Sequence, residues 1–283
     1  MNRVLDSWCE RVLHEWPGPV GEAVAYSLRG PGKRLRPALV IAGYRSLGGS
    51  GDPTELASAV EVVHTYSLVH DDLPCMDDDE LRRGRPTTHC RFDVATATEA
   101  AFRMVPLSAR VLAAGAARLG LDAATTGAVA LELFRGAGSS GMVGGQVMDL
   151  EAEGREVSRE DLVCIHSAKT GALITASVVM GALAAEASAD RVEAIRSYGR
   201  EIGLAFQIVD DILDATATSS QLGKTAGKDA KQHKATYVSI VGLDAATREV
   251  EQHIRNAMDH LAAAQVDSEL LGNLARFVAQ RRN

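Results

Sequence analysis

Two short segments, far apart in the chain, carry the same acidic pattern. Residues 67–77 read SLVHDDLPCMD and residues 206–214 read FQIVDDILD, so each apolar run ends in paired aspartates followed closely by another. Asp210 and Asp214 are four residues apart, which places both carboxylates on one face of a helix. Carboxylates crowded beside apolar surface need a cation or a shared proton. Because Mg²⁺ is usually held by few carboxylates together with substrate phosphates, the pattern predicts a metal–phosphate site.

The first acidic segment is the denser of the two. Its acids are Asp71, Asp72, Asp77, Asp78, Asp79 and Glu80. Pro74 should end the helix near Asp72, and the chain then bulges, so that Asp71 and Asp77 could face one site. Arg82, Arg83 and Arg85 follow at once, and guanidinium groups fork onto phosphate oxygens. One such cluster fits a solvated charged loop equally well, but two clusters at the ends of apolar helices favour a binding site.

Basic residues elsewhere are further candidates for binding phosphate. The run Gly32-Lys33-Arg34-Leu35-Arg36-Pro37 lies just before a predicted helix, and a helix N-terminus combined with cations favours phosphate. Lys169 and Thr170 interrupt an otherwise apolar helix, so the lysine needs an anion or a route to solvent. Lys224 and Lys234 follow the second acidic segment and could fold back over bound phosphate. An exposed turn for the basic run, and a solvated loop for these two lysines, are the alternative interpretations.

Glu61 and His64 have the E-x-x-H spacing that helical di-iron proteins use. Such a site needs two of these pairs, and the sequence has no second one. His64 is therefore either a core or cavity histidine or a hydrogen-bond donor to a substrate.

The elements that must position these residues are predicted to be helices. Apolar residues recur at intervals of three and four, most clearly over residues 54–72, 94–119, 122–135, 159–185, 190–214 and 245–264. Asp52 and Pro53 favour a helix start before Thr54, and Ser158 can cap the helix that begins at Arg159. Period-two alternation is almost absent. We predict a single all-α domain over residues 1–283, with about ten helices and few or no strands.

Composition narrows the class of protein further. Hydrophobic residues make up 46% of the 283 residues, which excludes intrinsic disorder, and aromatics make up only 4%, so the core must be aliphatic. A net charge of −7 argues against a general nucleic-acid binder. The four cysteines stand far apart with no C-x-x-C pair, which argues against a zinc cluster or a disulfide framework.

No membrane or export signal is expected. The N-terminal sequence MNRVLDSWCERVLHEW is charged throughout, unlike a signal peptide. Residues 170–185 form an uncharged stretch of 16 residues, whereas a bilayer span needs roughly 17–25 apolar residues. We interpret this stretch as a buried helix and expect a soluble, cytoplasmic protein without a membrane span.

Taken together, the motifs resemble those of the trans-isoprenyl diphosphate synthases (polyprenyl synthetases) of the bacterial short-chain kind. The matching segments are GKRLRP at 32–37, HTYSLVHDDLPCMDDDELRRGRPTTH at 64–89, GMVGGQVMDL at 141–150, KTGAL at 169–173, FQIVDDILD at 206–214, LGKTAGKDA at 222–230 and KATY at 234–237. The resemblance implies an isoprenoid-synthase helical bundle around a deep central cavity, usually in a homodimer. It implies head-to-tail condensation of isopentenyl diphosphate with an allylic diphosphate such as dimethylallyl or geranyl diphosphate.

By the same resemblance, the two acidic motifs would face each other and hold three Mg²⁺ ions, with Mn²⁺ as an alternative. The implied metal ligands are Asp71, Asp72, Asp77, Asp210, Asp211 and Asp214, with Asp72 and Asp211 ranked behind the other four. The implied catalytic residues, which would contact the allylic diphosphate or stabilise the cation, are Lys169, Thr170, Gln207, Lys224 and Lys234. The implied substrate-binding residues are Gly32, Lys33, Arg36, His64, Arg82 and Arg83.

Product length in this family depends on the residues just before the first acidic motif. Tyr66 lies five residues before Asp71, and Ser67 lies one helical turn before it. Together with the two-residue insertion Pro74-Cys75, this pattern resembles farnesyl-making enzymes, because a bulky ring would stop growth near a C15 chain. We predict farnesyl diphosphate as the product, with geranylgeranyl or geranyl diphosphate as alternatives.

Two other functions compete with this interpretation. A class I terpene cyclase shares the metal–diphosphate chemistry, but its second motif is usually Asn/Asp–Ser/Thr–Glu rather than DDILD, and its cavity is rich in aromatics. A non-catalytic subunit of a heteromeric synthase usually loses the acidic motifs, and both are intact here. One departure from the family is Ala101-Phe102, where Gly-Asp is common. We expect Phe102 to narrow the cavity or to reshape helix packing.

Overall fold

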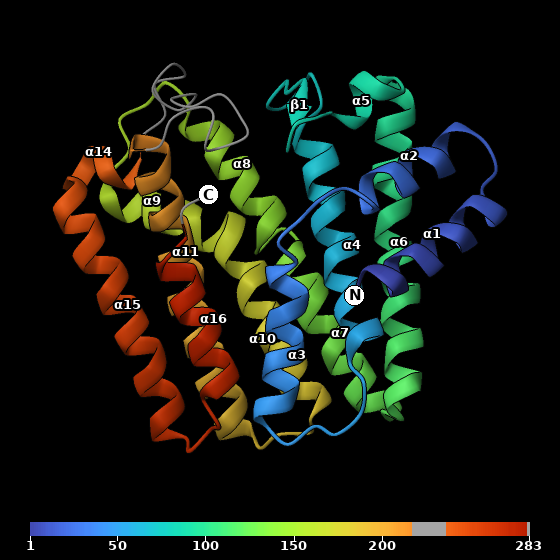
Figure 1. The fold of residues 1–283 in the computed structure, drawn as a ribbon. Helices are drawn as coiled ribbons and strands as arrows, with labels where there is room; N and C mark the ends of the chain where they lie inside the picture. Colours follow the sequence, from blue (N-terminus) through green and yellow to red (C-terminus); the bar gives the residue numbers. More distant parts are fainter. Residues whose placement is uncertain (217–235, 282–283) are drawn as a thin grey trace. The chain divides into compact units, whose positions relative to one another are not determined.

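The computed structural model describes residues 1–216 and 236–281, and this part of the chain is almost entirely helical (Figure 1). The chain divides into two compact units. The first comprises Met1–Ala38 and Gly51–Asp122, and the second comprises Leu39–Ser50 and Ala123–Asn283. Helix α3 (Leu35–Ser46) begins in the first unit and continues in the second.

In the first unit, the two long helices α4 (Thr54–Asp71) and α6 (Val94–Leu119) pack side by side (Figure 1). The other elements of this unit are α1 (Asn2–Glu15), α2 (Pro19–Leu28), β1 (Leu81–Arg82), β2 (Arg85–Pro86) and α5 (Thr88–Arg91). Asp93 caps α6, because its carboxylate accepts a hydrogen bond from the Thr96 N–H at 2.7 Å.

Helix α4 is the core helix of the first unit, since residues 55–63 are all buried. Its buried Glu55 accepts a hydrogen bond from Trp8 Nε1 at 3.1 Å and pairs with Arg118 Nε at 2.8 Å. A buried carboxylate is tolerated only when it is paired in this way. The contacts tie α4 to α1 and α6, and they fix the helix whose C-terminal end carries the first acidic motif.

Helix α10 (Ala172–Ala184) is the core helix of the second unit, and nearly all of its residues are buried. Helices α7 (Ala123–Ala137) and α11 (Ala189–Thr216) pack against it. In Figure 1, α15 (Leu243–Ala263) and α16 (Glu269–Ala279) lie alongside α11. The remaining elements are α8 (Met142–Ala152), α9 (Arg159–His166), the π-helical segment η1 (Ser167–Gly171) and α14 (Tyr237–Val241).

The predicted buried helix at residues 170–185 is confirmed by α10. The longer run Arg159–Ala184 is apolar and long enough to cross a membrane by length and composition alone, yet 61% of its most apolar window is buried inside the structure. Such burial is typical of the core helix of a soluble protein. The absence of a membrane span stays a prediction.

The all-α prediction is confirmed, and the β structure of the described residues is one pair of two-residue strands. Ser158 caps α9 as predicted, because its hydroxyl accepts a hydrogen bond from the Asp161 N–H at 3.1 Å. The described residues contain fourteen α-helices rather than about ten. Short helices such as α5 and α14 account for part of the difference, because one turn shows no periodicity. The single domain over residues 1–283 stays a prediction.

Candidate active site

The first acidic motif folds back on itself where α4 ends. The N–H of Asp77 donates a hydrogen bond to the carbonyl of Asp71 at 2.8 Å, and the N–H of Asp79 donates to the carbonyl of Asp72 at 3.3 Å. Pro74 cannot continue the helix, and Asp78 has a φ of +48° within the turn. Asp71 and Asp77 are therefore neighbours across this turn, as the bulge in the sequence predicted.

Asp72 has a different environment from Asp71. Its side chain is buried, and its Oδ1 accepts a hydrogen bond from Arg82 Nε at 2.7 Å and pairs with Arg82 Nη2 at 2.5 Å. Burial raises the pKa of Asp72 above its usual range, and the Arg82 guanidinium offsets part of that rise. Asp72 therefore anchors the segment that follows the motif, and its rank among the metal ligands stays a prediction.

The three arginines after the motif are arranged by a tight hairpin. Strands β1 and β2 pair Arg82 with Arg85, and the turn between them contains Arg83 at φ +53° and Gly84 at φ +74°. Two consecutive residues with positive φ match the twist of a two-residue hairpin. Within residues 1–216 and 236–281, Arg83 is one of five non-glycine residues with positive φ, and Arg34 and Asp78 are two others. Such backbone strain tends to cluster at functional sites.

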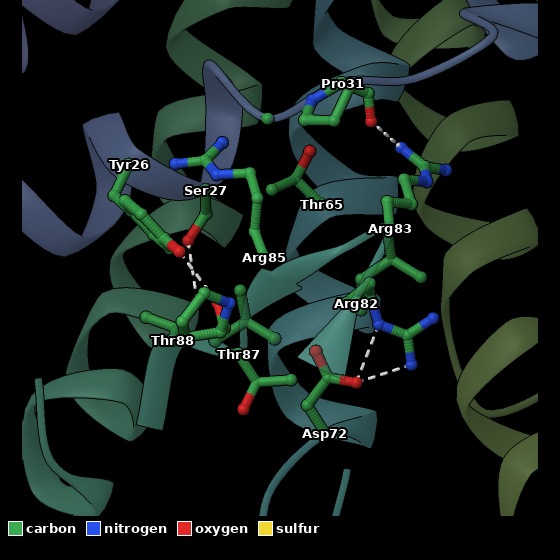
Figure 2. Close-up of a pocket in the computed structure, with 14 residues that line it drawn as sticks. Tyr26, Ser27, Pro31, Thr65, Asp72, Arg82, Arg83, Arg85, Thr87 and Thr88 are labelled. Carbon is green, nitrogen blue, oxygen red and sulfur yellow. Dashed lines mark hydrogen bonds and ion pairs between the residues drawn. The ribbon is translucent and has the colours of Figure 1, made fainter. Parts of the chain in front are cut away.

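A small open pocket, with a cavity volume of about 70 Å³, lies between this hairpin, α2 and α4 (Figure 2). The α4 residues that line it are Thr65, Leu68, Val69 and Asp72. His64, Ser67 and Asp71 follow the neighbouring face of the same helix, about 100° around its axis. The pocket therefore contains the predicted Asp72, Arg82 and Arg83 and lies beside the helix face that carries the predicted His64, Ser67 and Asp71.

Gly32 is needed for the approach of Arg83 to the basic loop. Arg83 Nη1 donates a hydrogen bond to the Pro31 carbonyl (Figure 2), and a Cβ at position 32 would lie 2.6 Å from that nitrogen. A side chain at position 32 would push the guanidinium away. Gly32 and Arg83, which the sequence assigned to one substrate site, are thus brought together, and the predicted Lys33 lies exposed beside them.

His64 lies among four arginines of the first unit. Its Nε2 is 3.1 Å from Arg36 Nη1. Burial lowers the pKa of His64 well below its usual value, and Arg36, Arg83, Arg82 and Arg34 lower it further. The imidazole is therefore neutral near pH 7, so Nε2 accepts from Arg36 and Nδ1 carries the proton. That buried Nδ1 has no hydrogen-bond partner among the described residues, and a bound anion would supply one.

Glu61 plays a structural role that sequence reasoning missed. It is buried, and Arg34 Nη1 donates to its carboxylate, while Arg34 Nη2 donates to the carbonyls of Leu28 at 3.1 Å and Gly30 at 3.0 Å. This pairing ties the basic loop to α4. It also occupies the glutamate of the E-x-x-H pair, which removes the remaining basis for a di-iron site there.

Lys169 and Thr170 of the second unit lie in the π-helical segment η1. Short π-helical turns occur frequently at functional sites. Lys169 Nζ donates to Asp149 Oδ2 at 2.6 Å, so the predicted lysine does have an anionic partner. A Cβ at Gly145 would lie 2.1 Å from the backbone nitrogen of Lys169, which explains why α8 has a glycine at this position. Asp149 was missed, although it lies within the quoted segment GMVGGQVMDL.

Two more buried polar residues of the second unit were also missed. His166 Nε2 lies 3.9 Å from Asp211 Oδ2, and burial lowers the pKa of His166 to about 4, with Asp149 opposing and Lys169 reinforcing that effect. Its Nδ1 and both amide atoms of Gln146 are buried without hydrogen-bond partners in the described structure. Unsatisfied buried polar groups are rare, which marks this region as a candidate site.

The second acidic motif lies near the C-terminal end of α11. Asp211 is buried, and its Oδ2 accepts a hydrogen bond from the backbone N–H of Tyr237 at 2.6 Å. Asp210 is 36% exposed and pairs with Arg281 Nη2 at 2.8 Å. Asp214 and Gln207 are half-buried one turn to either side. The predicted Lys224 and Lys234 lie outside the described residues.

The donor chemistry of the two motifs fits a divalent metal of the magnesium type. No group of three or more candidate ligands converges within the described residues. Mg²⁺ does not need such a cage, because one or two carboxylates, water and substrate phosphates usually complete its shell. Asp71 with Asp77, and Asp210 with Asp214, offer carboxylates in pairs of this kind.

The residues near Asp71 that were predicted to limit chain length lie on α4. Ser67 is buried, and its hydroxyl donates to the His64 carbonyl at 2.9 Å. Tyr66 is half-buried with its ring 5.9 Å from that of His70. Phe102, in contrast, is 71% exposed on α6, so the expectation that it narrows a cavity was wrong. It falls on the outer face of the helix, whereas its neighbour Ala101 is buried.

The family model "Polyprenyl synthetase" matches residues 18–271. The chain belongs to this family. The farnesyl diphosphate synthase of Bacillus subtilis (strain 168) is 40% identical over 94% of this chain and 90% of the relative. The chloroplastic heterodimeric geranylgeranyl pyrophosphate synthase large subunit 1 of Arabidopsis thaliana is 42% identical over 100% of this chain and 77% of the relative. The solved geranyltransferase from Helicobacter pylori, complexed with magnesium and isoprenyl diphosphate, has a TM-score of 0.80 and 28% identity over 97% of this chain and 94% of that one.

Membership confirms the resemblance drawn from the motifs. This polyprenyl synthetase has the all-α fold of its solved relatives and is an enzyme, a trans-prenyltransferase of the short-chain type. The family model covers residues of both units, so we consider the sites of both units together as parts of one enzyme.

The neutral state of His64 gives a pH dependence. Because its folded pKa lies below the ordinary value of about 6.5, the unfolded chain binds more protons between the two values, and stability falls as the pH drops below 6.5. Between pH 7 and pH 5, the wild type should therefore lose more unfolding free energy than His64→Gln. Urea unfolding at both pH values measures this, with His14→Gln on the exposed face of α1 as the control. An equal loss in wild type and His64→Gln would show that the imidazole is not held neutral.

Proposed function

We propose that this chain condenses isopentenyl diphosphate head to tail with dimethylallyl or geranyl diphosphate and releases farnesyl diphosphate. The observation that supports this best is the surroundings of His64, where burial, reinforced by four arginines, lowers the pKa of the imidazole and where its buried Nδ1 has no hydrogen-bond partner among the described residues. Such a concentration of positive charge suits a diphosphate, which carries several negative charges. A farnesyl diphosphate synthase among the relatives supports the product.

In this proposal the first unit binds isopentenyl diphosphate. Its diphosphate is held by Gly32, Lys33, Arg36, His64 and Arg83. Gly32 leaves room for the Arg83 guanidinium, and the Arg34–Glu61 pair holds the loop that carries Lys33 and Arg36. Arginine provides several donors in a fixed plane, which fits phosphate oxygens better than a point charge does.

The allylic diphosphate is assigned to the acidic motifs and to the lysine segment of the second unit. The family uses a divalent metal for diphosphate binding. We assign three Mg²⁺ ions, with Mn²⁺ as an alternative, to Asp71, Asp77, Asp210 and Asp214, and we give Asp72 and Asp211 supporting roles. Arg82, Lys169, Thr170, Gln207, Lys224 and Lys234 complete the set that contacts this diphosphate or the cation formed from it.

The chain's own groups favour ionisation of the allylic carbon–oxygen bond. When bound, the metal ions neutralise negative charge on the leaving diphosphate. Lys169, oriented by Asp149, donates a hydrogen bond to that charge as it develops. The aliphatic walls of the buried helices exclude water that would otherwise quench the carbocation. The isopentenyl double bond then attacks the cation, and the proton is lost to the departing pyrophosphate.

The polyprenyl synthetase is further proposed to be a cytoplasmic homodimer that does not bind nucleic acid. These proposals follow from its acidic net charge and from the family resemblance.

The activity is tested with purified protein, Mg²⁺, isopentenyl diphosphate and each allylic primer. Chromatography of the products should show farnesyl diphosphate. Geranylgeranyl diphosphate would instead indicate the alternative that the plant relative represents. Hydrocarbon products would indicate a terpene cyclase, and no turnover would indicate a non-catalytic subunit.

Replacing Gly32 should separate binding of isopentenyl diphosphate from folding. In Gly32→Ala the new Cβ displaces the Arg83 guanidinium, which is the flexible end of its side chain. We expect the KM for isopentenyl diphosphate to rise roughly fivefold, equivalent to about 1 kcal/mol, with a smaller change in kcat. Steady-state kinetics measure this against Gly127→Ala, where a Cβ meets nothing within 4 Å. An unchanged KM would remove Arg83 from this substrate site.

Replacing Tyr66 tests the assignment of product length. Tyr66→Ala removes a half-buried ring next to the first acidic motif, so elongation should continue past the C15 product. Chromatography of the prenyl products measures the shift, and Phe102→Ala, which removes an exposed ring from α6, should leave product length unchanged. If Tyr66→Ala still releases only farnesyl diphosphate, this ring does not set product length.

A further inference from the structure

The last described residue of the chain reaches the second acidic motif. Arg281 follows α16, its side chain is only 8% exposed, and its Nη2 lies 2.8 Å from Asp210 Oδ1. The guanidinium carbon lies 4.1 Å from the centre of the Phe206 ring. Phe206 and Asp210 are one turn apart on α11, so Arg281 covers both side chains on one helix face.

This guanidinium is incompletely satisfied. Its Nε and Nη1 are buried and have no hydrogen-bond partner among the described residues. Buried arginines normally donate to several acceptors, often through two parallel hydrogen bonds to one carboxylate. Unmade hydrogen bonds of a buried charged group oppose its burial. The position of Arg281 therefore depends heavily on one ion pair with Asp210 and on its stacking over Phe206.

The contrast with Asp72 shows that this pair is not built as a permanent anchor. Arg82 contacts Asp72 through both Nε and Nη2, and the Asp72 side chain is 4% exposed. Arg281, in contrast, pairs with Asp210 through Nη2, while its other two guanidinium nitrogens have no partner among the described residues, and the Asp210 side chain is 36% exposed. A solvated cation can therefore reach the carboxylate of Asp210 while Arg281 is in place.

We propose that Arg281 is the resident counter-ion of Asp210 in the metal-free enzyme and that a divalent cation displaces it on binding. The inference rests on the proposed role of Asp210 as a metal ligand. A divalent cation bound to the Asp210 carboxylate would lie next to the buried guanidinium of Arg281. Because the two positive charges repel each other and Arg281 has few hydrogen bonds to hold it, the Arg281 side chain would leave the carboxylate. Arg281 is thus a positioning residue, because it neutralises Asp210, one turn from Asp214, before metal arrives.

The exchange predicts that Arg281 competes with metal. Titration of the full chain with Mn²⁺ alone, followed by the EPR signal of free Mn²⁺, should show about tenfold tighter binding for Arg281→Gln than for the wild type. Arg281→Lys keeps the charge and should bind close to the wild type. Arg276→Gln, on the exposed face of α16, should bind as the wild type does. Asp210→Asn should weaken binding and cancel the gain when combined with Arg281→Gln.

The outcomes separate this inference from the proposed function. If Asp210→Asn weakens Mn²⁺ binding but Arg281→Gln leaves it unchanged or weaker, the counter-ion role is wrong and the metal site stands. If Asp210→Asn has no effect, the metal role of Asp210 fails and the exchange fails with it. Should Arg281→Gln not fold, Phe206→Leu loosens the seat of the guanidinium and should tighten Mn²⁺ binding by a smaller factor; no tightening would overturn the proposal.

Discussion

A charged group that is removed from water must be paired, and this constraint gives the two aspartates of each acidic pair different roles. In each motif the second aspartate of the pair is buried. Asp72 holds the hairpin through Arg82, and Asp211 holds the start of α14 through the Tyr237 N–H. The first aspartates, Asp71 and Asp210, keep 18% and 36% of their side chains exposed. The buried second aspartate fixes the backbone of the motif, and this fixed backbone positions the more exposed first aspartate. Two adjacent aspartates thus provide one anchoring carboxylate and one accessible carboxylate.

The same constraint extends outward from the second motif. Asp211 can be buried because α14 is itself fixed: the Tyr237 hydroxyl accepts a hydrogen bond from Arg159 Nη2 at 3.1 Å and donates to Glu249. Arg159 and Glu249 come from α9 and α15, and Tyr237 itself belongs to an apolar cluster that includes Ile208 and Val209 of α11. A polar network satisfied at every member rigidifies its surroundings. The position of the aspartates therefore depends on residues far from them in sequence.

Much of the fold could be predicted from the sequence, because long helices reveal themselves by periodicity and caps. The predicted helix over residues 94–119 matches α6, and Ser158 caps α9. The return of Asp77 to Asp71 also followed from local chemistry, since Pro74 must end the helix. Pairings across the chain could not be predicted in this way. Glu61 with Arg34 and Asp149 with Lys169 depend on tertiary packing, and no spacing rule connects residues 27 or 20 positions apart.

The wrong prediction for Phe102 shows that a comparison with family motifs must also consider which face of a helix a residue occupies. The substitution of Ala101-Phe102 for Gly-Asp drew attention to the larger residue, because a ring can block a cavity. On α6, however, adjacent residues differ by about 100° around the axis, and this rotation places Ala101 on the buried face and Phe102 outside it. Ala101 and Met104 are buried while Phe102 is exposed. Ala101, the smaller residue, packs in the core, and Phe102, the larger one, lies on the surface. The volume of the Phe102 ring therefore does not disturb the packing of the unit. The helical period, more than side-chain size, therefore decides what a substitution on a core helix changes.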